Sequence, residues 1–158
     1  MTSLTRVYRF SASHRLHSPL FSDEENARIF GKCNNPYGHG HNYVLSVTVS
    51  GTVDPHTGLL VSAFTLDKLV NEKVLDLFSN CNINLDVPQF SELVPTTENL
   101  ALVIADLLLQ HWSEYLADST AALRRVHVQE TDRNGFEVLV PARAVRRKIQ
   151  IEGLLVHA

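Results

Sequence analysis

Two histidines stand two residues apart in the stretch GKCNNPYGHGHNY, which spans residues 31–43. Alternating hydrophobic residues follow them, so His39 and His41 open a predicted strand and point to one face of it. His14 ends an earlier alternating segment. If the two strands pair as a hairpin, the three imidazoles converge on a metal site with one open position, an arrangement typical of catalytic zinc. The alternative is that each histidine is only a hydrogen-bonded residue beside a turn.

A cysteine and a glutamate are the other chemically notable residues. Cys33 precedes the histidine pair in a loop and follows Lys32, so a nearby cation and a bound metal are expected to lower its pKa and make it a general base. A free cysteine can also be a small buried hydrophobic residue. Glu130 shares a strand face with hydrophobic residues, where a carboxylate needs a donor. It is half of a salt bridge, a residue at a strand end already in solvent, or a clamp for the N–H edge of a guanidine-like ring.

Composition limits the classes of protein that remain. The chain has 158 residues and a formal net charge of −3, with 44% hydrophobic residues and two cysteines. This predicts one globular domain, with no general affinity for nucleic acid and no disulfide framework. No apolar segment is long enough to span a membrane, and the first ten residues, MTSLTRVYRF, do not resemble a signal peptide. We therefore expect a cytoplasmic protein.

The predicted elements form an α+β fold. Alternation predicts strands over 5–14 and 39–51, a short strand at 59–63, and a hairpin whose strands flank the turn DRNG at 132–135. Helical periodicity predicts helices over 65–78 and 97–116, and a capping-box pattern begins a short helix at Ser22. This order indicates an antiparallel sheet with helices on one face.

Four segments together resemble the 6-pyruvoyl-tetrahydropterin synthase family, with the 6-carboxytetrahydropterin synthases as its nearest relatives. They are FSASHRLHSP, SDEENARIFGKCNNPYGHGHNY, PTTENLA and VHVQET. The resemblance implies the tunnelling fold, a four-stranded antiparallel sheet with two helices on one face. It also implies zinc bound by His14, His39 and His41, Cys33 as the catalytic base, and Glu130 as the anchor of a pterin ring with help from Thr97 and Glu98.

The family resemblance further implies a reaction and an assembly. The substrate would be 7,8-dihydroneopterin triphosphate, which loses triphosphate and becomes 6-pyruvoyltetrahydropterin through internal redox. Subunits would form trimers and then hexamers, with sites at the interfaces. The resemblance covers most of residues 5–140. We expect one domain over residues 1–142 and a C-terminal extension over 143–158, either a solvated tail or an added subunit contact.

One segment departs from the family pattern. The family usually carries an Asp-His pair in a motif like LDHKNLDKDVP, whereas this chain reads FSNCNINLDVP over residues 78–88. Alignment without gaps places Ser79 and Asn80 at the pair, and a two-residue deletion places Cys81 and Asn82 there. Since the pair takes part in proton transfer in the family, three functions remain open. They are a slow synthase, a paralogue giving 6-carboxytetrahydropterin or a hydroxymethylpterin, and a non-catalytic zinc-containing pterin-binding protein.

Overall fold

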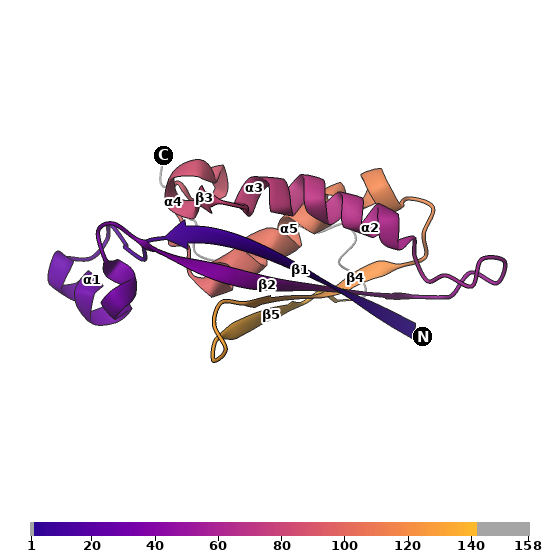
Figure 1. Ribbon diagram of the computed structural model, residues 1–158, viewed down its shortest axis with the longest axis horizontal. Helices are drawn as coiled ribbons and strands as arrows, with labels where there is room; N and C mark the ends of the chain where they lie inside the picture. The colour runs from indigo at the N-terminus through magenta and orange to yellow at the C-terminus, as the bar shows by residue number, and fades with distance from the viewer. Residues whose placement is uncertain (1, 142–158) are drawn as a thin grey trace.

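A twisted sheet forms one layer of the protein, and helices pack against one of its faces (Figure 1). The computed structural model describes residues 2–141. The sheet order is β3-β1-β2-β4-β5. The strands are β1 (Thr2–His14), β2 (His39–Gly51), β3 (Cys81–Asn82), β4 (Ala122–Gln129) and β5 (Gly135–Leu139).

The sheet differs in one respect from the four-stranded antiparallel sheet that we predicted. Strands β1, β2, β4 and β5 pair antiparallel as expected. The short strand β3 pairs parallel to β1, with Cys81 opposite Ala12 and Asn82 opposite Ser13. The sheet is therefore mixed and five-stranded. Two paired residues in a loop-like segment leave too short an alternation to be recognised from sequence.

The helical elements follow the predicted periodicity with altered boundaries. The expected helix 65–78 is α2 (Ala63–Val70), followed by a π-helical turn η2 (Asn71–Leu75) and α3 (Asp76–Phe78). The expected helix 97–116 is α5 (Thr97–Leu116), whose N-cap is Thr96. The predicted short strand at 59–63 is wrong, because residues 60–61 form a bend and α2 already begins at residue 63. Two short helices, α4 (Ile83–Asp86) and η3 (Pro88–Phe90), complete this layer.

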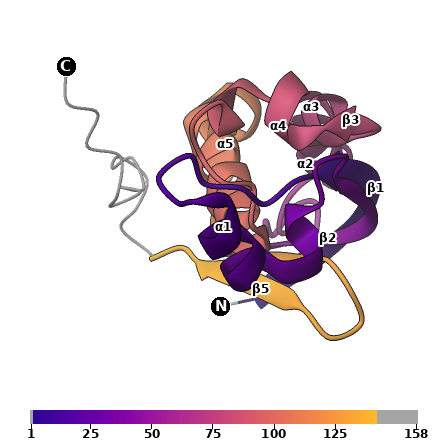
Figure 2. The ribbon, with the colours of Figure 1, turned by 90° about the vertical axis from the view of Figure 1, so that its left-hand side faces the viewer.

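A small lobe extends past the end of the sheet where β1 finishes and β2 begins (Figures 1 and 2). It contains α1 (Asp23–Phe30) and the 3-10 helix η1 (Gly31–Asn34). The predicted capping box is present, since Ser22 accepts from the Glu25 N–H and the Glu25 carboxylate accepts from the Ser22 N–H. Within the lobe, Asn26 is fully buried, and the hydrogen bonds of its side chain all go to backbone groups of residues 18–22.

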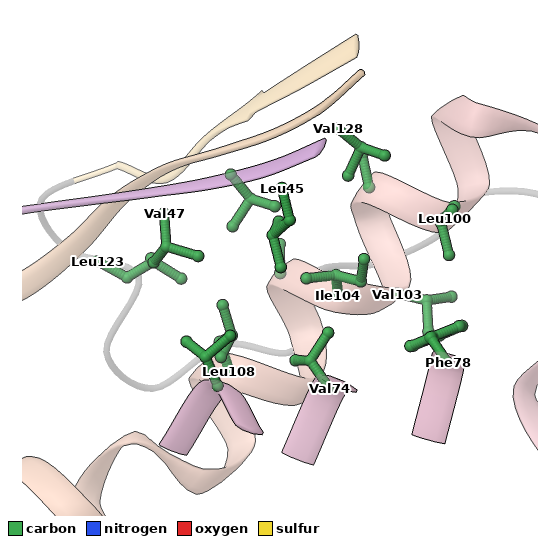
Figure 3. Packing of buried hydrophobic residues seen from close by; sticks show 14 of the residues in the cluster. Leu45, Val47, Val74, Phe78, Leu100, Val103, Ile104, Leu108, Leu123 and Val128 are labelled. Carbon is green, nitrogen blue, oxygen red and sulfur yellow. The ribbon is translucent and has the colours of Figure 1, made fainter. Parts of the chain in front are cut away.

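The hydrophobic core lies between the sheet and the helices (Figure 3). Alternate residues of β2 face inward and are buried, namely Tyr43, Leu45, Val47 and Val49. They meet buried side chains of α2, η2 and α5, including Leu66, Val74, Leu100, Ile104 and Leu108. The same alternation carries His39 and His41 onto this inner face at the start of β2.

Two further sequence predictions concern membrane-spanning helices and the C-terminal extension. None of the helices within residues 2–141 is long and apolar enough to cross a membrane. The expected extension at 143–158 lies outside the described residues.

Candidate metal and pterin site

The pairing of β1 with β2 brings the three histidines together. In the register of this hairpin, His14 lies opposite His39, and Ala12 lies opposite His41. The Nε2 atoms of His14 and His39 are 3.2 Å apart. One nitrogen from each of the three rings lies within 4.8 Å of the others, and the three ring centroids are 4.8–5.1 Å apart. The predicted convergence of these side chains is confirmed.

The close approach of the chain at this point depends on Gly38. This residue has φ +69°, and an added Cβ would lie 2.8 Å from the His14 carbonyl oxygen. Gly40, the glycine between the two histidines, does not make such a contact. A Cβ on Gly40 would instead meet the nearest atom at an ordinary 3.5 Å. The tight contact is therefore one residue before the strand, where the loop turns into β2.

His14 is the most enclosed of the three, at 1% exposure. Its Nδ1 lies 2.8 Å from the Pro95 carbonyl oxygen. Because a carbonyl oxygen only accepts, Nδ1 carries the proton and Nε2 presents its lone pair toward the other histidines. Burial lowers the pKa of His14, and this outweighs the hydrogen bond to Pro95 and the Glu130 carboxylate, which both raise it. Burial also lowers the pKa of His39. Both rings are consequently neutral near pH 7, the form that ligates a metal.

The environment of His41 also fits a metal ligand. Its Nε2 is buried and has no hydrogen-bond partner among the described residues. A buried polar nitrogen without a partner is costly unless another species satisfies it. The donor set is three imidazole nitrogens on a rigid hairpin, which suits a divalent ion that prefers nitrogen ligands. The three histidines thus form a possible metal site, and the residues fit zinc.

Glu130 lies at the edge of this cluster. Its Oε1 is 3.7 Å from His14 Nε2 and 3.6 Å from His41 Nε2, and its side chain is 12% exposed. These separations are too long for hydrogen bonds, so the carboxylate keeps its capacity to accept from another donor. The predicted turn between β4 and β5 holds it, since the Glu130 N–H donates to the Asn134 carbonyl at 2.9 Å.

Cys33 sits in η1, in the lobe beside the end of β1. Its carbonyl accepts from the Leu16 N–H at 2.8 Å, which ties η1 to the segment just after His14. Burial, followed by the charge of Glu130, raises the pKa of the Cys33 thiol. This is opposite to the direction that we expected from Lys32, which is exposed. Within the protein itself, the thiol is therefore protonated at neutral pH.

The two predicted residues on α5 follow closely after Pro95, whose carbonyl accepts a hydrogen bond from His14. Thr97 is buried and Glu98 is exposed in the first turn, two and three residues after Pro95. Among the described residues, no hydrogen bond joins either side chain to the histidines. Their role in ligand binding stays a prediction.

The segment that departs from the family pattern runs along the outer side of β1. Asn80 has φ +57°, and its N–H donates to the Ser11 carbonyl at 2.6 Å. Cys81 donates its thiol to the Phe78 carbonyl at 3.3 Å, and Asn82 caps α4 by accepting from the Asn84 N–H. Asn80, Cys81 and Asn82 line an open hollow with Ser11 and Asn42.

Two residues near the histidines were not found from sequence. The Pro95 carbonyl is a main-chain group, so no side-chain pattern reveals it. Asn84 holds the main chain just after His14, because its Oδ1 accepts from the Arg15 N–H at 2.8 Å and its Nδ2 donates to the Arg15 carbonyl at 2.9 Å. A lone asparagine in a polar segment gives no signal of such a role.

Known proteins resemble this chain in sequence and in fold. Residues 3–140 match the family described as 6-pyruvoyl tetrahydropterin synthase. A 6-pyruvoyl tetrahydrobiopterin synthase of Poecilia reticulata is 47% identical over 131 residues, covering 83% of this chain and 85% of the relative. The 6-pyruvoyl tetrahydrobiopterin synthase of Homo sapiens is 45% identical over 131 residues, covering 83% of this chain and 86% of the relative.

The fold comparison agrees with the sequence comparison. The solved structure of Caenorhabditis elegans 6-pyruvoyl tetrahydropterin synthase superposes with a TM-score of 0.78 at 38% identity, covering 89% of this chain and 96% of that one. The matched region contains both strands of the histidine hairpin, the α5 start and Glu130. This chain therefore belongs to the 6-pyruvoyl tetrahydropterin synthase family.

Proposed function

We propose that this protein is a zinc-dependent lyase of pterin synthesis that acts on 7,8-dihydroneopterin triphosphate and releases triphosphate to give 6-pyruvoyltetrahydropterin. The observation that carries the proposal is the convergence of three histidine nitrogens within 4.8 Å, with the Glu130 carboxylate 3.6–3.7 Å from two of them. A metal site beside an acceptor for a ring edge suits a substrate that has both a hydroxylated side chain and a pterin ring. The family assignment supports the same substrate class.

Zinc would be held by His14, His39 and His41, which leave one coordination position open. When bound there, the ion supplies Lewis-acid chemistry at side-chain oxygens of the substrate and acidifies the adjacent C–H bonds. The protein contributes a rigid support, because His14 and His39 face each other across directly paired strands. Burial lowers the pKa of His14, so that this ring stays neutral and able to bind a metal near neutral pH.

Glu130 would bind the pterin ring. A carboxylate accepts two N–H groups side by side, and the amidine edge of a pterin presents such a pair. Its distance from the histidine nitrogens leaves its oxygens free for that edge. Thr97 and Glu98, at the start of α5, would assist on the side of the site formed by the Pro95 carbonyl.

Cys33 would be the general base that moves protons along the substrate side chain. Its thiol must then lose its proton in the loaded enzyme, although protein groups alone raise its pKa. The positive charge of a bound ion acts in the opposite direction and favours the thiolate. Proton transfer also needs an accepting and returning group on the opposite side of the substrate.

The residues aligned with the family Asp-His pair do not readily supply that second group. Ser79 and Asn80 do not titrate near neutral pH, and Asn82 already caps α4. We therefore propose that conversion is slow or incomplete, while metal and pterin binding are retained. The alternative outcomes are side-chain cleavage to a hydroxymethylpterin, formation of 6-carboxytetrahydropterin, and binding without chemistry.

The proposal includes a homo-oligomer, assembled as a dimer of trimers with sites at subunit interfaces, in the cytoplasm. The form of the sheet supports an assembly through strand edges. Within residues 2–141, β3 pairs only with Ala12 and Ser13, so the β1 edge from Thr2 to Ser11 has no strand neighbour. Long unpaired edges are ready templates for pairing with another chain.

A product assay tests the proposed reaction. The purified protein at known zinc content is incubated with 7,8-dihydroneopterin triphosphate, and products are identified by mass. We expect 6-pyruvoyltetrahydropterin and inorganic triphosphate at a low rate, and none from Cys33→Ala. A hydroxymethylpterin or a 6-carboxy product would replace the proposed reaction with the corresponding alternative. Bound but unchanged substrate would indicate a binding protein.

A further inference from the structure

The orientation of His14 depends on a loop whose geometry is set by one asparagine. The imidazole is almost fully buried, and its Nδ1–H donates to the Pro95 carbonyl at 2.8 Å. The hydroxyl of Tyr43 is a more distant neighbour of the same nitrogen, at 3.5 Å. The Pro95 carbonyl is therefore the acceptor that selects the tautomer and fixes the rotation of this ring.

The residues on both sides of Pro95 are tied to Asn99. The side-chain Nδ2 of Asn99 donates to the Val94 carbonyl at 2.8 Å. The Thr96 N–H donates to the same carbonyl, also at 2.8 Å. The Thr96 hydroxyl in turn accepts from the Asn99 N–H at 3.3 Å. Three hydrogen bonds thus join Val94, Thr96 and Asn99 into one closed unit around Pro95.

Pro95 contributes stiffness but no donor of its own. Its ring fixes φ and it has no N–H, so the direction of its carbonyl follows the conformation of the segment from Val94 to Thr96. Val94 precedes a proline and is restricted to extended conformations. The Asn99 side chain is the one side-chain donor that fastens the Val94 carbonyl in the described structure.

Capping of α5 does not account for this side chain. The Thr96 hydroxyl already caps the helix by accepting from the Asn99 N–H. The Asn99 amide points back out of the helix to a carbonyl that precedes it, so it satisfies none of the free N–H groups of the first turn. Its hydrogen bond holds the loop and leaves the helix terminus as it was.

We propose that Asn99 is a positioning residue for the metal centre. It acts through Val94 and Pro95 to fix the tautomer and ring orientation of His14, so that Nε2 faces the other two histidines. The proposal rests on the proposed metal site and adds to it a residue that touches neither metal nor substrate. Groups that orient a metal-ligating histidine typically change metal affinity by 10- to 100-fold when removed. Because Asn99 acts through one further link, we expect an effect of about tenfold.

Two substitutions of Asn99 test the proposal. Asn99→Ala removes the donor, and Asn99→Asp keeps the shape but turns an acceptor toward the Val94 carbonyl. Asp54→Ala is the matched control, since it removes side-chain bonds to the His56 and Thr57 N–H groups in an exposed turn at the opposite end of β2. Zinc affinity is measured by competition with a chromogenic chelator. We expect about tenfold weaker zinc binding in both Asn99 variants and no change in the control.

Two spectroscopic measurements separate positioning from general destabilisation. Cobalt(II) in place of zinc should show altered visible bands in both Asn99 variants and unaltered bands in Asp54→Ala. In the metal-free protein, nitrogen-15 NMR of the histidine rings should show His14 as a single Nδ1–H tautomer, which becomes mixed in Asn99→Ala. If Asn99→Ala does not fold, Pro95→Ala keeps the carbonyl but frees φ, and should give a smaller change in the same direction.

Failure of this proposal can be told from failure of the proposed function. Zinc affinity within about twofold of the unmodified protein in both Asn99 variants, with an unchanged His14 tautomer, would overturn the positioning role. If the unmodified protein binds zinc but forms no product, the synthase reaction fails and the role of Asn99 is still tested. If the unmodified protein binds no zinc, the metal site fails, and an unchanged His14 tautomer in Asn99→Ala would overturn the link through Pro95 as well.

Discussion

Each histidine of the cluster depends on different surroundings for its state. His14 is buried and donates to a main-chain carbonyl, whereas His41 has a buried nitrogen with no partner among the described residues. His39 faces His14 across the strand pair. The rings therefore converge as neutral donors from two strands, and no single one is dispensable to a three-coordinate set.

Replacement of one ligand should remove the metal. We expect about one zinc per chain in the unmodified protein and loss of most of it in His39→Ala, because two imidazoles hold zinc far less strongly than three. Metal analysis after gel filtration measures this. His56→Ala, at an exposed histidine in a turn, is the control and should keep its zinc. Full zinc retention in His39→Ala would exclude His39 from the site.

Glu130 should affect the ring and not the metal. Glu130→Gln replaces an acceptor oxygen with a donor, so a buried N–H of the pterin would face another N–H. The expected loss is about 1–3 kcal/mol of binding free energy, with zinc content unchanged. Calorimetric titration with biopterin measures it, and Glu137→Gln on the neighbouring strand is the control. Equal affinities in the two variants would leave Glu130 with a structural role only.

At the scale of elements, the β1–β2 hairpin is the support of the site, and the loop before β2 determines how closely its strands meet. Gly38 has φ +69° and packs against the His14 carbonyl, while Gly58 has φ +70° with no atom near its Cβ position. The two glycines share a backbone conformation and differ in their neighbours. Substitution of the two glycines therefore separates the free-energy cost of placing an alanine at positive φ from the cost of the contact with the His14 carbonyl.

Gly38→Ala should therefore be more harmful than Gly58→Ala. Both variants place an alanine at positive φ, which costs about 1–2 kcal/mol of folding free energy. Gly38→Ala must also displace the main chain beside His14, which an added Cβ would approach to 2.8 Å. We expect a larger fall in the free energy of unfolding and a loss of zinc for Gly38→Ala alone. Equal stabilities and equal zinc contents would mean that the loop moves freely and does not set the site.

The segment from Ser79 to Asn82 carries the prediction on turnover. General acid–base groups contribute about 10²- to 10⁴-fold in rate. Ser79, Asn80 and Asn82 do not titrate near neutral pH. Burial raises the pKa of the Cys81 thiol, so it also holds its proton at neutral pH. Ser79→Asp combined with Asn80→His should raise turnover at equal zinc content. Asn80 has φ +57°, which histidine also tolerates better than most residues. A wild-type rate equal to that of a relative with the pair would mean that another residue transfers the proton.

At the scale of the whole molecule, the two-layer arrangement buries His14 and partly buries His39, and so couples stability to pH. The pKa values of His14 and His39 are lowered by burial in the folded protein. As the pH falls below the ordinary value of 6.5, the unfolded chain takes up protons that the folded chain does not. Unfolding is then favoured, and stability falls with pH in this window.

Thermal unfolding of chelator-treated protein between about pH 7.5 and pH 5.5 measures the effect, because the carboxylates stay ionised over that range. We expect the midpoint to fall on acidification and the slope to be shallower in His39→Ala. A midpoint that does not depend on pH in the unmodified protein would contradict the neutral state of the His14 and His39 rings.

The sequence alone determined the main elements and the identity of the candidate residues. Alternation in residues 39–51 and helical spacing in 97–116 persist over many residues, and such long periodic patterns reflect burial on one face. The spacing of His39 and His41 placed both on the inner face of β2, and the position of His14 at the end of β1 placed it opposite. Hairpin pairing then suffices to bring them together.

Only the tertiary structure decided the contacts that orient these residues. The bond from His14 to Pro95, the clamp of Asn84 on Arg15 and the approach of Glu130 to the histidines all join segments that are far apart in the chain. The parallel strand β3 and the raised pKa of Cys33 were also not evident from sequence. These features depend on main-chain carbonyls, burial and distances across the fold, which residue types and their spacing do not encode locally.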